Sequence, residues 1–178
     1  MRVHTPAMIR RLLPTALLCL TLCQCDSLRN DCRALAAREA EIAAETPGAH
    51  YIGRRYYLPG TRFWGYLRKP GQSWRTAQLV IMDEQLARTP DRGLEPPVKG
   101  AVFGRDKNVE YYVYGSYTGE KAYDPSTDQV LPIFQAREYK VRNPKPGFLF
   151  IPSEQYSPSF VTLVPRIMPQ PSQCSNAQ

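Results

Sequence analysis

Carboxylate side chains are the residues in this sequence that could carry out acid–base chemistry. Five of them lie in or beside the stretch 109–142: Glu110, Glu120, Asp124, Asp128 and Glu138. Two carboxyl groups roughly 5–10 Å apart are what a glycosidase uses to cleave a glycosidic bond. Charged residues at alternating positions are also ordinary on the solvent-facing side of an antiparallel sheet. We favour this second interpretation and assign no catalytic residue, and we keep a periplasmic carboxylate-based enzyme acting on glycan or cell-wall material as the alternative.

The chain offers little for metal or nucleophilic chemistry. Its two histidines are His4, close to the start, and His50, and one histidine cannot form a histidine-based metal site. The segment 124–135 resembles a calcium loop in its alternating polar residues, but Gln129 stands where such a loop needs glycine and Gln135 where it needs glutamate. A hairpin turn explains that segment better. We expect no metal and no cofactor, and we expect His50 to be a surface or half-buried residue.

Aromatic and arginine side chains are concentrated between residues 54 and 74. Such a set could stack on sugar rings or bases and pair with anionic groups. The simpler interpretation is a packed core, in which alternate aromatic residues of each strand point inward and the arginines point outward. If the domain binds a partner here, the contact surface comprises Arg55, Tyr57, Trp64, Tyr66 and Trp74.

The first 24 residues have the composition of an export signal. Basic residues at the start precede an apolar run over 12–22, which is followed at once by Cys23 and Cys25. The run has eleven residues and contains Pro14, so it is too short for a membrane-spanning helix, which needs roughly twenty apolar residues. We therefore expect residues 1–24 to be a signal peptide that is removed.

The end of this signal, Leu-Thr-Leu-Cys-Gln-Cys, resembles the lipobox of bacterial lipoproteins, in which a cysteine becomes the acylated first residue. Acylation of Cys25 leaves Leu22 at the usual upstream leucine position, and the alternative, Cys23, leaves Leu20 there. The resemblance implies an exported protein of the cell envelope, periplasmic or associated with the outer membrane, that is held to the membrane by a lipid anchor. Simple cleavage without lipid is the other possibility.

Two cysteines remain in the body of the exported chain, Cys32 and Cys174. Disulfides form and persist in exported proteins, and two cysteines allow one intramolecular pairing. We expect a Cys32–Cys174 disulfide that joins an N-terminal helix to the C-terminal tail; free thiols or pairing with another chain are the alternatives.

The net charge does not indicate a nucleic-acid partner. Removal of residues 1–24 takes away three of the 23 basic residues and none of the 16 acidic ones, so the net charge falls from +7 to about +4. The remaining excess is modest and spread along the chain, and export separates the protein from cytoplasmic nucleic acid. We expect no nucleic-acid partner; the sequence does not identify the envelope protein or glycan that would be the partner.

After the signal, the sequence divides into an anchor segment with a helix (25–48), a β domain (49–165) and a tail rich in proline and serine (166–178). Alanine and glutamate predict the helix over 27–46, and Pro47-Gly48 end it. Branched and aromatic residues between turn signals predict six or seven short strands, which we place at 51–58, 61–68, 75–82, 109–118, 129–142, 148–151 and 160–164.

These elements predict a mainly β domain, with an N-terminal helix followed by a small antiparallel sheet or barrel. The number and length of the strands resemble the oligonucleotide/oligosaccharide-binding barrel, known as the OB fold. An SH3-like barrel or a small sandwich would have similar strands. The sequence favours a binding or assembly module of the bacterial envelope over an enzyme.

Overall fold

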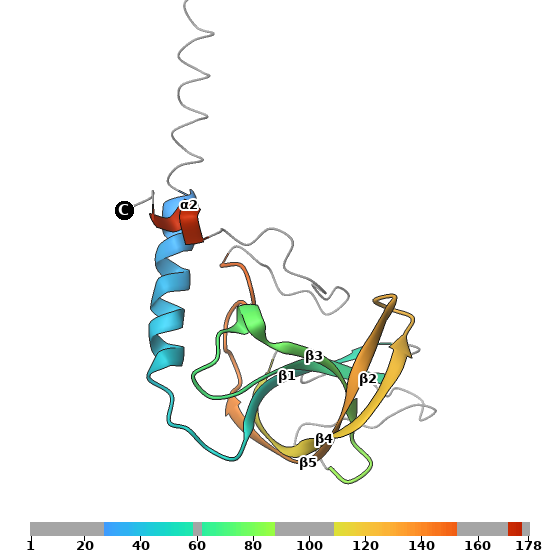
Figure 1. Cartoon of the computed structure of the whole chain (residues 1–178). Coiled ribbons are helices and arrows are strands. Elements are labelled where there is room, and N and C mark those ends of the chain that lie inside the picture. Colours follow the sequence, from blue (N-terminus) through green and yellow to red (C-terminus); the bar gives the residue numbers. More distant parts are fainter. Residues whose placement is uncertain (1–26, 59–61, 88–108, 153–170, 176–178) are drawn as a thin grey trace, which may run out of the picture.

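The computed structural model describes residues 27–58, 62–87, 109–152 and 171–175 (Figure 1). They form a mainly β domain with a helix at its N-terminal side over 27–43. Five strands follow, together with a short 3-10 helix, η1, and a short C-terminal helix, α2: β1 Tyr51–Leu58, β2 Arg62–Arg68, η1 Trp74–Thr76, β3 Gln78–Asp83, β4 Glu110–Asp124, β5 Gln129–Asn143 and α2 Pro171–Ser175. None of the helices in these segments has the length and apolar character needed to cross a membrane.

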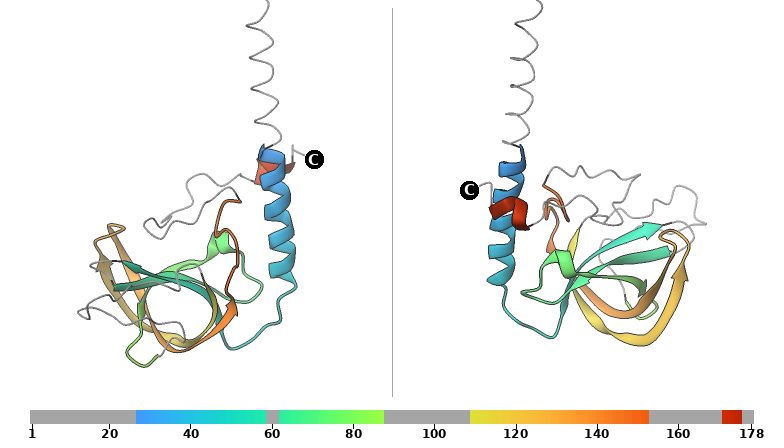
Figure 2. Two further views of the ribbon diagram at one scale, coloured as in Figure 1. Left: turned by 180° about the vertical axis from the view of Figure 1, so that it is seen from behind. Right: turned by 45° about the horizontal axis from the view of Figure 1, so that its top comes forward.

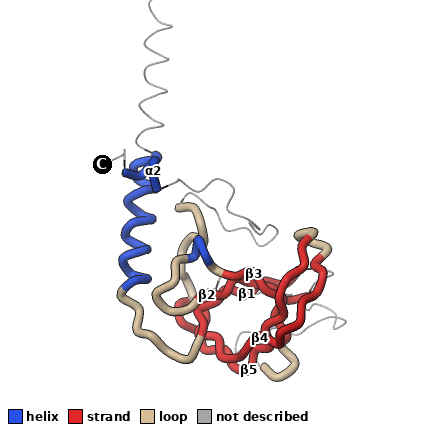
Figure 3. The backbone as a smooth tube through the Cα atoms, in the orientation of Figure 1, coloured by secondary structure: helices blue, strands red, loops and turns tan. Residues whose placement is uncertain are grey.

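The strands close into a barrel in the order β1-β2-β3-β5-β4 (Figure 3). Every pair is antiparallel except β3 and β5, which run parallel over Ile81–Asp83 and Ile133–Gln135. β1 closes the barrel because its first half pairs with β4 and most of its length pairs with β2. Gly65 of β2 allows the backbones of β1 and β2 to approach closely, since a Cβ at this position would lie 2.2 Å from the carbonyl oxygen of Arg54.

The mainly β architecture and the N-terminal helix confirm the sequence prediction, but the strand count does not. Five strands form in the described segments, compared with the six or seven predicted. Residues 148–151 form no strand; they bend across the outside of the barrel, where Leu149 and Phe150 are buried in its core. The predicted strand 160–164 lies outside the described residues. β4 and β5 are longer than predicted, so the turn between them narrows to residues 125–128.

The inside of the barrel is filled by apolar side chains from β2 to β5 and by Ala87, and the half-buried Tyr51 and Tyr57 of β1 pack against them. The buried members are Phe63, Leu67, Val80, Met82, Ala87, Tyr111, Val113, Phe134, Ala136 and Tyr139. Members two residues apart, such as Val80 and Met82 or Tyr111 and Val113, follow the period-two pattern expected when one face of a sheet turns inward.

The outside of β1 and β2 is also buried, by other parts of the same chain. Its core combines helix residues, outward-facing strand residues and the segment after β5: Leu35, Ile42, Ile52, Tyr56, Trp64, Tyr66, Trp74, Leu79, Leu131, Leu149 and Phe150. The helix stands beside the barrel, and η1 and the segment 144–152 lie between them (Figures 1 and 2). Edge-to-face packing of Tyr66 on Phe150, with ring centroids 4.9 Å apart, is part of this second core.

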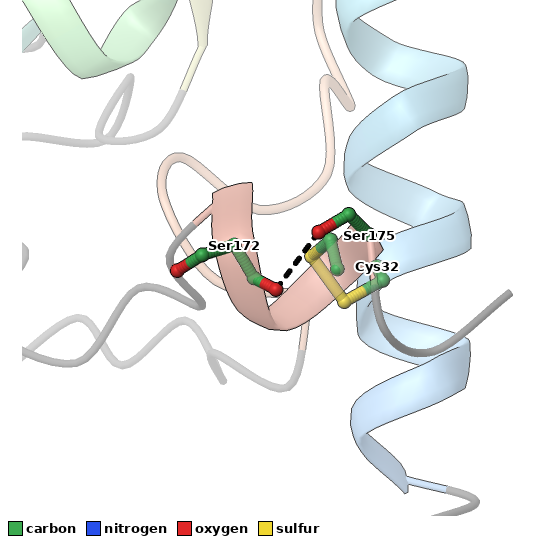
Figure 4. The surroundings of a disulfide bond; sticks show 4 residues. Cys32, Ser172 and Ser175 are labelled. Atoms are coloured by element: carbon green, nitrogen blue, oxygen red, sulfur yellow. Dashed lines mark hydrogen bonds between the residues drawn. A yellow bond between two sulfur atoms is a disulfide. The ribbon is translucent and has the colours of Figure 1, made fainter.

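A disulfide joins Cys32 of the helix to Cys174 of α2, as the sequence predicts (Figure 4). Their Cα atoms are 5.4 Å apart and 142 residues separate them in sequence. α2 therefore lies against the helix, at the end of the helix that is farther from the barrel (Figure 1). The start of the described chain and its C-terminal part are in this way held together on one side of the molecule.

Candidate functional site

The predicted contact surface is buried. Trp64 has no exposed area, Arg55, Tyr66 and Trp74 are each at most 5% exposed, and Tyr57 is half-buried and packs against the core inside the barrel. The prediction of a contact surface is thus wrong for these residues as they stand in the fold. The physical reason is that both faces of β1 and β2 are covered, one by the barrel interior and the other by the helix and the segment 144–152.

The five candidate carboxylates do not converge on a cleft. Glu110 is buried and paired with arginine, whereas Glu120, Asp128 and Glu138 are exposed. Asp124 accepts hydrogen bonds from the backbone N–H of Ser126 (3.2 Å) and the hydroxyl of Thr127 (2.7 Å). Segment 124–128 is therefore a turn stabilised by its own aspartate, and the described residues hold no group of three or more side chains suited to a metal ion.

A buried ionic cluster joins the end of the helix to the barrel; we define it as Glu45, Arg68, Glu110 and Arg142. Glu45 accepts two hydrogen bonds from Arg68, at 2.5 and 2.6 Å, and one from Arg142 at 2.9 Å. Arg142 also pairs with Glu110. Arg142 thus holds two carboxylates at once, one from the loop after the helix and one from β4.

Hydrogen bonds and charges set the pKa values in this cluster. Burial alone would raise the pKa of Glu45, but hydrogen bonds from Arg68 and from the N–H of Gly71, with the charges of both arginines, outweigh burial and lower it. Burial would lower the pKa of Arg142, but the neighbouring Glu110 and Glu45 raise it. Glu45 and Arg142 are therefore held in their charged forms.

Two more arginines fix the segment after β5. Arg38 of the helix donates to the carbonyl oxygens of Phe148 and Pro146, and Arg54 of β1 donates to that of Gly147 at 2.9 Å. Burial and the nearby charge of Arg54 lower the pKa of Arg38 to about 10. This value still leaves Arg38 positively charged at neutral pH. The segment that covers the outside of the barrel is thus held by donors from the helix and from the sheet.

A separate ion pair lies inside the barrel. Arg55 makes two hydrogen bonds to Glu84, at 2.7 and 3.0 Å, and the Tyr139 hydroxyl donates to the same carboxylate at 2.9 Å. The guanidinium also stacks over the ring of Phe63, with 4.3 Å between its central carbon and the ring centroid. Arg55 is therefore a structural residue of the barrel.

An open groove lies beside the ionic cluster, between the end of the helix and the outer face of β4. Its volume is about 440 Å³, within the range of roughly 300–1,000 Å³ found for small-molecule sites. It is lined by residues of the helix end and the loop to β1, and by residues of the barrel: Glu41, Ala44, Glu45, Thr46, Pro47, His50, Ile52, Tyr112, Tyr114 and Arg142. The loop 44–50 that forms one wall is visible in Figure 3, where it runs from the helix to the barrel.

Three aromatic rings form one wall of this groove. His50 packs edge-on against Tyr112, with ring centroids 4.8 Å apart, and tilted against Tyr114 at 5.9 Å. The ammonium group of Lys140 of β5 lies over the ring of Tyr114, 5.1 Å from the ring centroid. The groove is the one place in the described chain where the half-buried His50, a row of tyrosines and the ionic cluster meet.

The β4–β5 hairpin projects beyond the barrel and exposes a second set of side chains. Tyr123 and Val130 face each other across the two strands and are 61% and 63% exposed. Tyr123 donates to Asp128 at 2.9 Å, and this hydrogen bond raises the pKa of Tyr123. The exposed pair is small and lies on the far side of the hairpin bulges, away from the groove.

No family model, no curated protein and no solved structure matches this chain. The proposed acylation sites, Cys25 and Cys23, lie outside the described residues.

Sequence reasoning missed the groove because its residues come from three separate stretches, 41–52, 112–114 and 142. One signal was available for the buried arginines. Arg54 and Arg55 are consecutive in a strand and must point to opposite faces, so one of them had to face the barrel interior.

Proposed function

We propose that this chain is an exported protein of the bacterial envelope, anchored by lipid at Cys25 or Cys23, and that its β domain is a binding module and not an enzyme. The observation that carries the proposal is the groove at His50, whose aromatic wall and ionic cluster are fixed by contacts from both the helix and the barrel. A ligand site needs such fixed geometry, because order that is already present in the free protein need not be paid for on binding.

The arrangement of the helix supports anchoring. The helix follows directly after the acylation cysteines, and it spans about 25 Å at 1.5 Å for each of its residues from 27 to 43. The loop after the helix, which lines the groove, lies at the opposite end of the helix from α2, to which Cys32 is joined (Figure 2). A lipid at Cys25 would therefore leave the groove away from the membrane surface, where it can meet an envelope protein or a glycan.

The order of the strands supports the finer assignment to the OB fold. That fold closes five strands in the order β1-β2-β3-β5-β4 with β3 and β5 parallel, as here. OB barrels bind their ligands on the face of strands 2 and 3 and at the loops between strands 1 and 2 and strands 4 and 5. In this chain the outer face of β2 is covered, with Trp64 and Tyr66 buried, so the binding site moves to the groove on the other flank of β1.

The state of the carboxylates supports binding over hydrolysis. The general acid of a glycosidase needs a raised pKa so that it stays protonated at neutral pH. Arg68 and Arg142 instead lower the pKa of Glu45, and Arg142 also neutralises Glu110. Glu45 is thus poorly suited to donate a proton, and both buried carboxylates hold arginines in place.

Site-specific photocrosslinking in intact cells tests this proposal. A photoreactive phenylalanine analogue replaces Tyr114 in the groove, Tyr123 at the hairpin or, as a control, the exposed Gln85 after β3. We expect a defined adduct from position 114 in the membrane fraction, identified by mass spectrometry, and none from position 85. If the protein leaves the membrane fraction when Cys23 and Cys25 are replaced by serine, the result supports the lipid anchor. Adducts equal to those of the Gln85 control, or hydrolysis of purified cell-wall glycan by the wild-type chain, would contradict the binding role.

A further inference from the structure

The charges around the groove cancel one another. Arg142 contacts both Glu45 and Glu110, and Arg68 contacts Glu45 at 2.5 Å. Glu110 also lies 3.7 Å from Arg54, so these salt bridges join three arginines to two glutamates. A third carboxylate, that of Glu41, lies on the groove wall and is exposed to solvent, so the three arginines are matched by three carboxylates. The groove therefore lacks the concentrated charge of one sign that selects a phosphate or another strongly charged ligand.

Several polar groups of the groove are still available to a ligand. Among the residues that the structure describes, Glu41, Thr46, His50 and Tyr114 make no hydrogen bond and no ion pair through their side chains, whereas Glu45 and Arg142 are fully engaged. A carboxylate only accepts hydrogen bonds, while hydroxyl groups and a neutral imidazole both donate and accept. The open groups are thus a mixture of donors and acceptors spaced around one cavity.

Apolar surface alternates with these polar groups. The rings of His50, Tyr112 and Tyr114 form one wall, and Ala44, Pro47 and Ile52 complete the lining. The tyrosine rings present both a flat apolar body and a polar hydroxyl. A ligand that fits this wall has apolar C–H surface on one face and hydroxyl groups around its edge.

We infer that the groove binds a neutral saccharide, one or two sugar rings long, and this inference rests on the binding role proposed above. A sugar ring has C–H groups for the tyrosine and histidine rings and hydroxyl groups for Glu41, Thr46 and Tyr114. It carries no charge that would have to be compensated by groups around the groove whose charges are already balanced. Glu41 accepts from sugar hydroxyls, and the imidazole of His50 can donate or accept.

Competing ligand classes fit the same groove less well. A nucleotide or sugar phosphate needs uncompensated cations, but the two hydrogen-bonding ends of Arg142 are occupied by Glu45 and Glu110. A quaternary ammonium is also drawn to tyrosine rings, but the positive charges of Lys140 over Tyr114 and of Arg142 over Tyr112 repel a second cation. A neutral polyhydroxyl ligand remains compatible with all of these contacts.

The histidine provides a direct test. His50 is the one histidine after residue 24, so in the mature chain its ring resonances need no further assignment. The full mature chain is labelled with ¹³C-histidine, purified in a detergent without sugar groups, and titrated with chitobiose and maltose; glucose 6-phosphate and choline serve as charged comparison ligands. We expect a neutral disaccharide to shift the His50 ring signals in a saturable manner. If no neutral sugar shifts them, or if the charged ligands alone do, the inference is wrong.

Matched substitutions locate the binding. Tyr114→Phe and Glu41→Gln each remove one polar group from the groove, whereas Tyr123→Phe and Glu120→Gln make the same chemical changes at exposed positions of the hairpin. Calorimetric titration should show at least a threefold weaker affinity for the two groove variants and an unchanged affinity for the two hairpin variants. Equal loss in both pairs would place the sugar elsewhere and overturn the inference.

The saccharide inference and the binding role fail in different ways. If position 114 crosslinks to an envelope protein but no sugar shifts the His50 ring signals, the saccharide inference is wrong and the binding role is supported. If no sugar shifts these signals and no crosslink exceeds the Gln85 control, both are wrong.

Discussion

Replacing Glu45 by glutamine is expected to destabilise the domain strongly, although the residue lies outside every strand. The carboxylate of Glu45 is 8% exposed and accepts from Arg68, whose side chain is 1% exposed, as well as from Arg142 and the N–H of Gly71. Glutamine keeps the shape of this side chain but removes its charge. The guanidinium of Arg68 is then left buried without a charged partner.

The size of the effect follows from these contacts. Breaking a buried ion pair by removing one partner costs about 3–5 kcal/mol. Arg68 keeps a hydrogen bond to the carbonyl oxygen of Gln72 at 3.2 Å, and Arg142 keeps Glu110, so the loss is smaller than for an isolated pair. We expect Glu45→Gln to lower the free energy of unfolding by about 2–4 kcal/mol. A loss of about 3 kcal/mol corresponds to a fall in Tm of roughly 6–12 °C for a domain of this size.

Urea unfolding followed by tryptophan fluorescence measures this loss, because Trp64 and Trp74 are buried in the core next to the cluster. Glu138→Gln is the matched control: it removes the carboxylate of the Glu138–Lys140 pair, whose side chains are 51% and 57% exposed. A surface pair of this kind contributes about 0–1 kcal/mol. If Glu45→Gln costs less than 1 kcal/mol, or no more than Glu138→Gln, the cluster does not hold the helix end to the barrel.

Three further predictions concern pH and the other covalent and ionic contacts. Because the folded-state pKa of Glu45 lies below its usual 4.5, its contribution to stability is fully present above that pH and is lost as the pH falls through the folded value. Below pH 4.5 the free energy of unfolding should therefore fall more steeply with decreasing pH for the wild type than for Glu45→Gln. Equal slopes of free energy against pH would contradict this. Replacing Cys32 and Cys174 together by serine should lower the free energy of unfolding by about 4–5 kcal/mol at most, as expected for a long closed loop, measured against the wild type under non-reducing conditions. Glu84→Gln should cost about 3–5 kcal/mol because it leaves Arg55 buried without its carboxylate, whereas Arg55→Met combined with Glu84→Leu should cost less in the same assay; the reverse order would refute the ion-pair account.

Local sequence pattern was sufficient to predict much of the secondary structure. Alternating aromatic and branched residues between Pro-Gly turns gave β1 and β2 almost to the residue, and the aspartate-rich turn between β4 and β5 was correctly placed. The helix ends at residue 43, three residues before the prediction. Its last turn tightens there, with the N–H of Glu45 donating to the carbonyl oxygen of Ile42, and this allows the Glu45 side chain to reach the barrel.

Non-local contacts explain what the sequence did not predict. Whether five strands form a sheet, a sandwich or a closed barrel depends on the parallel pairing of β3 with β5, and no local pattern encodes that pairing. The arginines were expected on the outside because they are charged. Arg55 and Arg68 are buried because Glu84 and Glu45, 29 and 23 residues away in sequence, neutralise them.

The ionic cluster and the disulfide together explain how a helix with few apolar contacts stays in place. The helix contributes only Leu35 and Ile42 to the apolar core among the described residues, which is too little buried surface to fix its direction. Cys32 ties its first half to α2, and Glu45 ties the residues after its last turn to Arg68 and Arg142. Between these two points, Arg38 donates to the carbonyl oxygens of Phe148 and Pro146, so the helix is held along its length and acts as a rigid stalk. For a lipid-anchored protein, such a stalk would fix the distance and the direction of the His50 groove relative to the membrane, which a flexible tether of the same length would not do.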